Sequence, residues 1–296
     1  MRITVFGAGA VGSLLGGMLS PAHDVVLVGR REHVDAVNAK GLRVRGTVEA
    51  TYRPEAREAV DGLGTQDVVL ITVKAYDTGN AVREVAPLVG PHTMAVSVQN
   101  GLGNVEIMER AFGPRAIIAV PVLGVTYLGP GEVRLSGLKE VAVGSTSGQH
   151  GMAIELGRVL SGSGIPARVT AQVRQEVWLK AVVNASVNPI TALVRKENGC
   201  ILRQNELREL SRAACAEGAR AAGACGVVPC AGDPFEKVME VVRATAGNRS
   251  SMLQDVERGK RTEIDEINGA LVRAGEERGV NMTVNRTLWS LVRSLR

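Results

Sequence analysis

Short apolar runs alternate with amphipathic stretches through the first half of the chain. Residues 11–19 predict a helix, and residues 131–135 followed by 141–144 predict a hairpin that closes the sheet. Strands separated by helices in this way are typical of a parallel sheet with right-handed crossovers. The apolar runs predict strands at residues 3–6, 25–28, 68–73, 94–98, 117–122 and 141–143.

The second half changes to a helical pattern from about residue 171. Long helical stretches are predicted at 206–223 and 263–278, and the last predicted strand is 167–169. A glycine-serine run at 161–164 precedes this change and marks a boundary near residue 167. We therefore expect an α/β protein: an N-terminal doubly wound domain, 1–167, followed by an all-α C-terminal domain, 168–296.

Composition narrows the class of protein. Hydrophobic residues make up 45% of the 296, but aromatic residues only 3%, so Val, Leu, Ile and Ala must fill the cores. The net charge is +5 without a dense basic cluster or interleaved aromatics, which argues against nucleic-acid binding. A mild positive excess suits an anionic cofactor and substrate.

The sequence predicts neither a membrane span nor a metal site. No apolar run approaches the roughly 18 uncharged residues of a membrane span. The first residues lead directly into a strand and not into a signal peptide, so the cytoplasm is the expected location. The four cysteines form no CxxC pair, so we expect free thiols and no metal site. They are Cys200, Cys215, Cys225 and Cys230.

A glycine motif follows the first predicted strand and opens the first predicted helix. Its residues are Gly7, Ala8, Gly9, Ala10, Val11 and Gly12, in the pattern G-x-G-x-x-G. Such glycines let backbone N–H groups approach a pyrophosphate at a helix N-terminus, as in Rossmann-like domains. The alternative is a glycine-rich turn that binds nothing, but the strand and helix on either side favour dinucleotide binding.

The end of the second strand indicates which dinucleotide is bound. NAD sites place an acid there for the ribose 2′-hydroxyl, whereas this strand ends with Gly29, Arg30 and Arg31. A guanidinium can pair with a 2′-phosphate, so NADPH is expected, with Arg30 as its contact. The alternative is that both arginines are simply solvated.

Two further strand ends carry polar residues. Lys74 follows one strand and Asn100, in the run Asn100-Gly101-Leu102-Gly103, follows another. Carboxyl ends of strands face the ligand crevice in this type of fold, so both residues are candidate cofactor or substrate contacts. A surface lysine and an ordinary Asn-Gly turn are the alternatives.

A polar stripe crosses an apolar helix in the second half. Lys180, Asn184 and Asn188 have i, i+4, i+8 spacing and share one helix face. Buried amides and ammonium groups need partners, which a ligand site or a satisfied structural network can equally provide. Further along the chain, Ser250 and Ser251 are equally consistent with helix capping, and Thr262 to Glu266 with the first turn of a helix.

The whole chain resembles the ketopantoate reductases (2-dehydropantoate 2-reductases). The resemblance runs in order from the glycine motif to Asn268, and its most specific part is Ser250 to Asp255 followed by Thr262 to Asp265. It also includes Lys74, Asn100 to Gly103, the helix with Lys180, Asn184 and Asn188-Pro189, and Asn198-Gly199.

The resemblance implies a role for each of these residues. Lys180 is expected to be the general acid, and Glu263 to contact the nicotinamide ribose and orient the site. Asn100 is expected to touch cofactor and substrate. The substrate carboxylate and hydroxyl are expected to bind Asn184, Asn188, Asn198 and Ser251. Apolar neighbours should lower the pKa of Lys180, and Glu263 should hold it up if the two groups approach.

The implied function is NADPH-dependent reduction of 2-dehydropantoate to (R)-pantoate in pantothenate and coenzyme A biosynthesis. An alternative is a reductase of another small branched 2-oxo acid. A different class, a non-catalytic NADP(H)-binding sensor, would need the glycine motif and Arg30 but neither Lys180 nor Glu263. The expected partner is a small-molecule 2-oxo acid, and a homodimer is compatible with the sequence.

Overall fold

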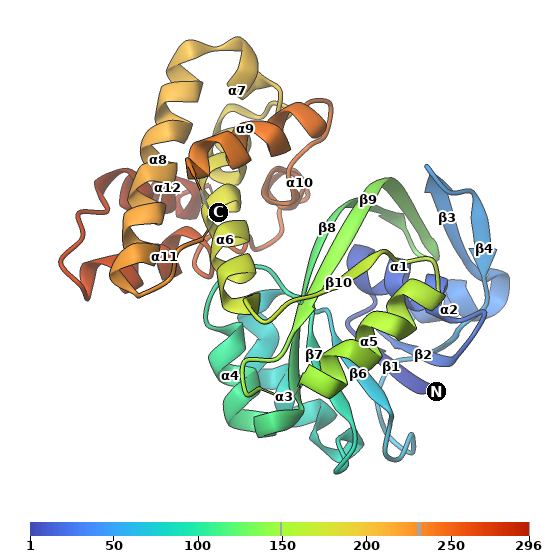
Figure 1. The fold of residues 1–296 in the computed structure, drawn as a ribbon. Coiled ribbons are helices and arrows are strands. Elements are labelled where there is room, and N and C mark those ends of the chain that lie inside the picture. Colours follow the sequence, from blue (N-terminus) through green and yellow to red (C-terminus); the bar gives the residue numbers. More distant parts are fainter. Residues whose placement is uncertain (149, 230–231, 296) are drawn as a thin grey trace. The chain divides into compact units, whose positions relative to one another are not determined.

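A computed structural model describes residues 1–148, 150–229 and 232–295. The chain divides into two compact units, which we call the sheet unit and the helical unit (Figure 1). The sheet unit comprises Met1–Gln99 and Asn104–Val173, and the helical unit comprises Asn100–Gly103 and Arg174–Arg296. The short segment after Gln99 therefore belongs to the helical unit, although it lies within the sequence of the sheet unit.

The sheet unit is built on one sheet, with strand order β4-β3-β9-β8-β7-β6-β1-β2-β5 and β10 paired with β9. Strands β1, β2, β5, β6, β7 and β8 run parallel, whereas β9 is antiparallel to β8. The strands are β1 (Arg2–Phe6), β2 (Asp24–Val28), β3 (Leu42–Gly46), β4 (Ala50–Tyr52), β5 (Glu55–Arg57), β6 (Val68–Ile71), β7 (Met94–Ser97), β8 (Ala116–Gly129), β9 (Glu132–Gly144) and β10 (Ala167–Val169).

The direction of winding reverses at β1, which pairs with β2 on one side and β6 on the other. Ligands of doubly wound sheets bind outside the carboxyl ends of the strands at such a point. Thr72, just after β6, ties the two strand ends together because its hydroxyl donates to Gly7 O at 2.8 Å. The helices of this unit are α1 (Ala10–Leu19), α2 (Arg31–Lys40), α3 (Thr78–Val85), α4 (Asn104–Phe112) and α5 (His150–Gly162).

The sheet curls around α1. This helix contacts β1 and β2 and also β3, β4, β8 and β9, which stand at the other end of the strand order. Small residues make the approach possible: an added Cβ at Gly16 would lie 2.3 Å from Leu27, and one at Gly17 would lie 2.9 Å from Leu42. Glycines in the middle of α1 are thus needed for close packing on two sides.

A buried histidine helps to hold this curl. His33 in α2 contacts Ser13 Oγ of α1 through Nε2 at 3.0 Å, and its Nδ1 accepts from Gly131 N, also at 3.0 Å. Because Nδ1 is an acceptor, the ring is neutral in this arrangement. Burial lowers the pKa of His33, which favours the same neutral form.

The predicted fold class is confirmed, and most strands lie where expected. The predicted hairpin of residues 131–144 is wrong, because β9 runs unbroken through both segments and pairs with β8 instead. The strand predicted at 68–73 ends at Ile71. Three short strands, β3, β4 and β5, were not predicted, although Leu42-Arg43-Val44-Arg45 carries the alternation that indicates one.

The helical unit packs around α6, whose apolar residues lie in its core. By length and composition alone α6 could cross a membrane, but most of its apolar window is buried inside the protein. The helix predicted at 263–278 is wrong at its start, since residues 263–267 form a turn and α11 begins at Asn268. The helices are α6 (Val173–Val194), α7 (Cys200–Arg203), α8 (Asn205–Ala224), α9 (Pro234–Ala244), α10 (Ser251–Glu257), α11 (Asn268–Glu276) and α12 (Thr283–Arg293).

Three of the four cysteines lie in the described ranges, and all three are free thiols as predicted: Cys200, Cys215 and Cys225. Burial raises the pKa of Cys200 and of Cys225, so both favour the neutral thiol. Cys230, also predicted to be free, lies outside the described residues.

Candidate active site

The glycine loop fits a bound dinucleotide. Gly7 has φ +108°, and a Cβ there would lie 2.6 Å from Val73 N, while one at Gly12 would lie 2.4 Å from Gly7 O. These two glycines are required by the turn itself and by the packing of α1 on β1. Gly9 differs, because it is exposed and a Cβ there would meet no atom closer than 3.9 Å. Its lack of a side chain leaves the loop backbone open to a phosphate group.

Arg30 and Arg31 have different surroundings after β2. Arg31 pairs with Glu58 at 3.1 Å. Arg30 is exposed at the start of α2 and has no ion pair with any residue of the described ranges. Of the two guanidinium groups, that of Arg30 is therefore the one available to an incoming anion.

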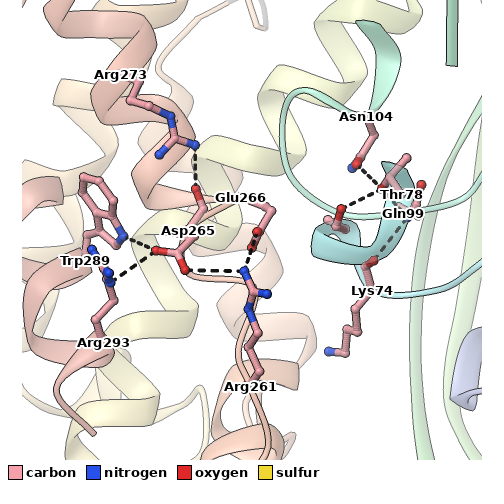
Figure 2. A network of polar contacts seen from close by, with 11 residues as sticks. Lys74, Thr78, Gln99, Asn104, Arg261, Asp265, Glu266, Arg273, Trp289 and Arg293 are labelled. Carbon is pink, nitrogen blue, oxygen red and sulfur yellow. Dashed lines mark hydrogen bonds and ion pairs between the residues drawn. The ribbon is translucent and has the colours of Figure 1, made fainter. Parts of the chain in front are cut away.

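The carboxyl ends of β6 and β7 are cross-linked by a side chain that was not predicted. Gln99 donates from Nε2 to Val73 O at 3.1 Å and to Thr78 Oγ1 at 2.8 Å. Thr78 in turn donates to Asn104 Oδ1 at 2.7 Å. Figure 2 shows this network, with the Lys74 side chain extending away from it. The network fixes the backbone that carries Lys74, and the only sequence signal for Gln99 is its position at a strand end.

The polar stripe of α6 lies between core and surface. Lys180 and Asn184 are half-buried and Asn188 is buried, while most of the residues between them belong to the apolar core. The stripe is therefore neither a solvated face nor a fully buried one. Half-buried polar groups on a rigid helix can contact a small polar ligand at low entropic cost.

A proline in α6 leaves a backbone carbonyl free to bond to the start of α11. Pro189 has no N–H, so the Ala185 carbonyl loses its usual partner within the helix. Asn268 Nδ2 donates to this carbonyl at 3.1 Å and to Asn285 Oδ1 at 3.0 Å. The first residue of α11 is thus attached to α6, and the turn at 263–267 directly precedes it.

The turn that ends at α11 carries Glu263, which is 5% exposed. Glu263 Oε2 accepts from Asn100 Nδ2 at 3.3 Å, and Glu266 O accepts from Leu102 N at 2.9 Å. Gly101 lies so close to the turn that a Cβ would be 2.5 Å from Glu266 O. The structure thus brings together two predicted site residues, Asn100 and Glu263, that are far apart in sequence.

An arginine-tryptophan cluster holds the outer side of this turn (Figure 2). Trp289 Nε1 donates to Asp265 Oδ1 at 2.7 Å, and Arg273 donates to Asp265 O at 3.0 Å. Arg261 lies 3.4 Å from Glu266 Oε1. Burial raises the pKa of Glu266, an effect that Arg261 partly opposes. Together with the contacts to Asn100 and Leu102, this cluster restrains the turn.

Lys180 is electrostatically coupled to Glu263. Burial lowers the pKa of the Lys180 ammonium to about 8, and the negative charge of Glu263 opposes part of this decrease. Both directions agree with the expectation from sequence. An ammonium with a pKa near neutrality is a better proton donor than an ordinary solvated lysine.

The remaining predicted residues cluster beyond the end of α6. Ser250 is the N-cap of α10, since its Oγ accepts from Leu253 N at 3.1 Å, and it also accepts from Thr191 Oγ1 at 2.8 Å. Capping therefore accounts for Ser250, whereas Ser251 is exposed in the first turn.

Asn198 is buried near the same segment. Its backbone N–H donates at 2.9 Å to the carbonyl of Asn248, a residue that lies two positions before Ser250 in the sequence.

A doubly wound sheet with an open glycine loop, and a lysine tuned by a glutamate, together define an oxidoreductase that uses a nicotinamide cofactor. The family described as "Ketopantoate reductase PanE/ApbA" matches residues 3–148, and its "C terminal" domain matches residues 172–296. This chain belongs to the ketopantoate reductase family.

Individual relatives match over almost the full length of the chain. The 2-dehydropantoate 2-reductase of Archaeoglobus fulgidus is 38% identical over 99% of this chain and 97% of its own. The solved 2-dehydropantoate 2-reductase from Geobacter metallireducens GS-15 is 28% identical, covers 100% of both chains and has a TM-score of 0.94. A D-mandelate dehydrogenase solved with NADH is 26% identical over 99% of this chain and 98% of its own, with a TM-score of 0.86.

Proposed function

We propose that this protein reduces the ketone of 2-dehydropantoate to (R)-pantoate with NADPH, a step that supplies pantothenate synthesis. The observation that carries the proposal is the electrostatic coupling of the half-buried Lys180 to the buried Glu263 in a chain of this family. A sensor that only bound the dinucleotide would have no use for an ammonium tuned in this way.

The reaction needs a proton as well as a hydride. When bound, the reduced nicotinamide supplies the hydride to C2 of the substrate. Negative charge then develops on the ketone oxygen, and the Lys180 ammonium stabilises that charge and donates the proton, which yields the alcohol. Such acid catalysis contributes about 10²–10⁴ in rate. Glu263 keeps a larger fraction of Lys180 protonated by raising its pKa.

The other site residues orient the two ligands. Asn100, whose amide already donates to Glu263, is proposed to touch both cofactor and substrate. Asn184, Asn188, Asn198 and Ser251 are proposed to bind the carboxylate and hydroxyl of the substrate. Holding the reacting carbons close together contributes to the rate by reducing the entropic cost of the reaction.

The choice of NADPH rests on Arg30. No carboxylate stands at the end of β2, and the Arg30 guanidinium is exposed without an ion pair among the described residues. A guanidinium can bind a 2′-phosphate through two hydrogen bonds, whereas an acid at this position would repel it. Lys74, at the end of β6, is proposed to contact the phosphates or ribose.

A second candidate function is the reduction of a bulkier 2-oxo acid. It is favoured by the likeness to a D-mandelate dehydrogenase that was solved with NADH. The test is a panel of 2-dehydropantoate, 3-methyl-2-oxobutanoate and phenylglyoxylate, each assayed with NADPH and with NADH. We expect the highest kcat/KM for 2-dehydropantoate with NADPH. A preference for phenylglyoxylate would favour the second candidate, and NADPH binding without turnover of any substrate would favour a sensor.

A further inference from the structure

The Asn198 side chain has one satisfied and one unsatisfied end. The residue is 7% exposed, and its Nδ2 donates to Thr245 Oγ1 at 2.9 Å. Its Oδ1 is buried and has no hydrogen-bond partner among the described residues. Burying a carbonyl oxygen without a donor is unfavourable, so a ligand that brings a donor to this atom gains affinity.

Thr245 determines which end of the amide remains unsatisfied. The Thr245 hydroxyl donates to Val241 O at 2.7 Å, so only its lone pairs are available to Asn198. A lone pair can accept from Nδ2 but cannot pair with Oδ1. The flipped amide would therefore lose the contact with Thr245, so Oδ1 is held as the end of the amide that lacks a donor among the described residues.

The backbone of Asn198 is also fixed. Its N–H donates to Asn248 O, and the N–H of Gly199 donates to Ala246 O at 2.8 Å. A Cβ at Gly199 would lie 2.8 Å from Ala246 O, so this close approach requires glycine. The acceptor therefore has a defined position as well as a defined chemistry, on the segment between α6 and α7 that is hydrogen-bonded to the loop before Ser250.

We propose that Thr245 is a positioning residue that makes the enzyme select a 2-oxo acid carrying a hydroxyl group. This inference rests on the proposed function. An isolated carbonyl acceptor pairs with an O–H donor but repels a carboxylate, so of the polar groups of 2-dehydropantoate it matches the C4 hydroxyl. A site built to bind a substrate hydroxyl discriminates strongly against the analogue that lacks it.

The test compares 2-dehydropantoate with 3,3-dimethyl-2-oxobutanoate, in which a methyl group replaces the hydroxymethyl group. We expect the unmodified enzyme to favour the hydroxylated acid by about 10² or more in kcat/KM. Thr245→Val keeps the shape of the side chain but lets the amide rotate. We expect it to lower this ratio about tenfold, mainly by raising KM for 2-dehydropantoate, because a tenfold loss corresponds to one ordinary hydrogen bond.

Two further variants separate positioning from folding. Thr245→Ser keeps the hydroxyl and should restore the ratio. Thr287→Val in α12 removes a similar hydroxyl, which donates to Thr283 O at 2.9 Å on an exposed face, and should leave the ratio unchanged. If Thr245→Val does not fold, Thr245→Ala provides the same comparison.

The outcomes distinguish a failure of the Thr245 role from a failure of the reductase function. An unchanged ratio in the Val or Ala variant, or an equal loss of activity on both acids, would overturn the role of Thr245. So would equal reduction of both acids by the unmodified enzyme, although the reductase function would stand. No turnover of 2-dehydropantoate by the unmodified enzyme would overturn the proposed function and this inference together.

Discussion

In the proposed mechanism, the Lys180 ammonium donates the proton that the reaction consumes. We expect Lys180→Ala to lower kcat by at least about 10² while NADPH still binds, because the glycine loop and Arg30 are unchanged. Steady-state kinetics and NADPH fluorescence titration measure the two effects. Lys196→Ala, at an exposed position after the same helix, is the matched control. Near-normal turnover of the Lys180 variant would remove this residue from the mechanism.

The pH dependence of the reaction follows from the same group. The acid form of Lys180 predominates below its pKa of about 8, so kcat/KM for ketone reduction should be level below this pH and fall above it. Glu263 raises the pKa, so Glu263→Gln should move this decline to lower pH. A pH profile of both proteins, with the exposed Glu197→Gln as control, measures the shift. A decline that stays in place, or moves to higher pH, would contradict the coupling.

Part of the residue-level site could be predicted from the sequence. The spacing of Lys180, Asn184 and Asn188 is a local property, and it placed them correctly along one helix. The contact of Asn100 with Glu263 joins residues far apart in sequence, and only the family resemblance suggested that both belong to one site. Gln99 and Thr245 act through hydrogen bonds that depend on the folded chain, so no spacing pattern indicates them.

At the scale of elements, the junction between α6 and α11 is the most consequential contact. Pro189 leaves the Ala185 carbonyl without a helical partner, and Asn268 supplies the donor. We expect Asn268→Leu to lower the free energy of unfolding by about 1–3 kcal/mol, since it leaves a buried carbonyl unpaired. Urea denaturation followed by circular dichroism measures this loss.

A double-mutant cycle shows whether the carbonyl is the cause. Pro189→Ala restores an N–H that can bond to Ala185 O within the helix. The loss caused by Asn268→Leu should therefore be smaller in the Pro189→Ala background than in the unmodified protein. Strict additivity of the two changes would show that Asn268 stabilises the protein in another way, for example through Asn285.

Elements could be predicted where the pattern is local and strong. Strands β1 and β2 each begin at a charged residue and are followed by glycine, and α1 follows the glycine loop. The limits of all three elements were predicted to within one residue. The sequence predicted two segments in place of the continuous strand β9, because Ser136 and Gly137 interrupt its apolar pattern. In the folded chain, pairing with β8 keeps the whole strand extended. The turn at 263–267 resembles a helix start, but its contacts with residues 100–102 hold it outside the helix.

At the scale of the whole molecule, cofactor choice can be measured as ligand-linked stability. A ligand that binds only the folded state at 100 times its Kd stabilises it by about 2.7 kcal/mol. We expect NADPH to raise the melting temperature more than equimolar NADH, because Arg30 can bind the 2′-phosphate. Arg30→Ala should reduce the NADPH shift and leave the NADH shift nearly unchanged. Arg31→Ala is the matched control, since that guanidinium already pairs with Glu58. Equal effects of Arg30→Ala on both cofactors would contradict the assignment.

The membership of residues 100–103 in the helical unit has a consequence for rebuilding this enzyme from parts. The chain passes between its two units after Gln99, after Gly103 and after Val173. A chimera joined only after Val173 would therefore combine the helical unit of another protein with residues 100–103 of this chain. A chimera intended to exchange substrate preference has to transplant both segments, so that Leu102 and the carbonyl it bonds to come from the same parent.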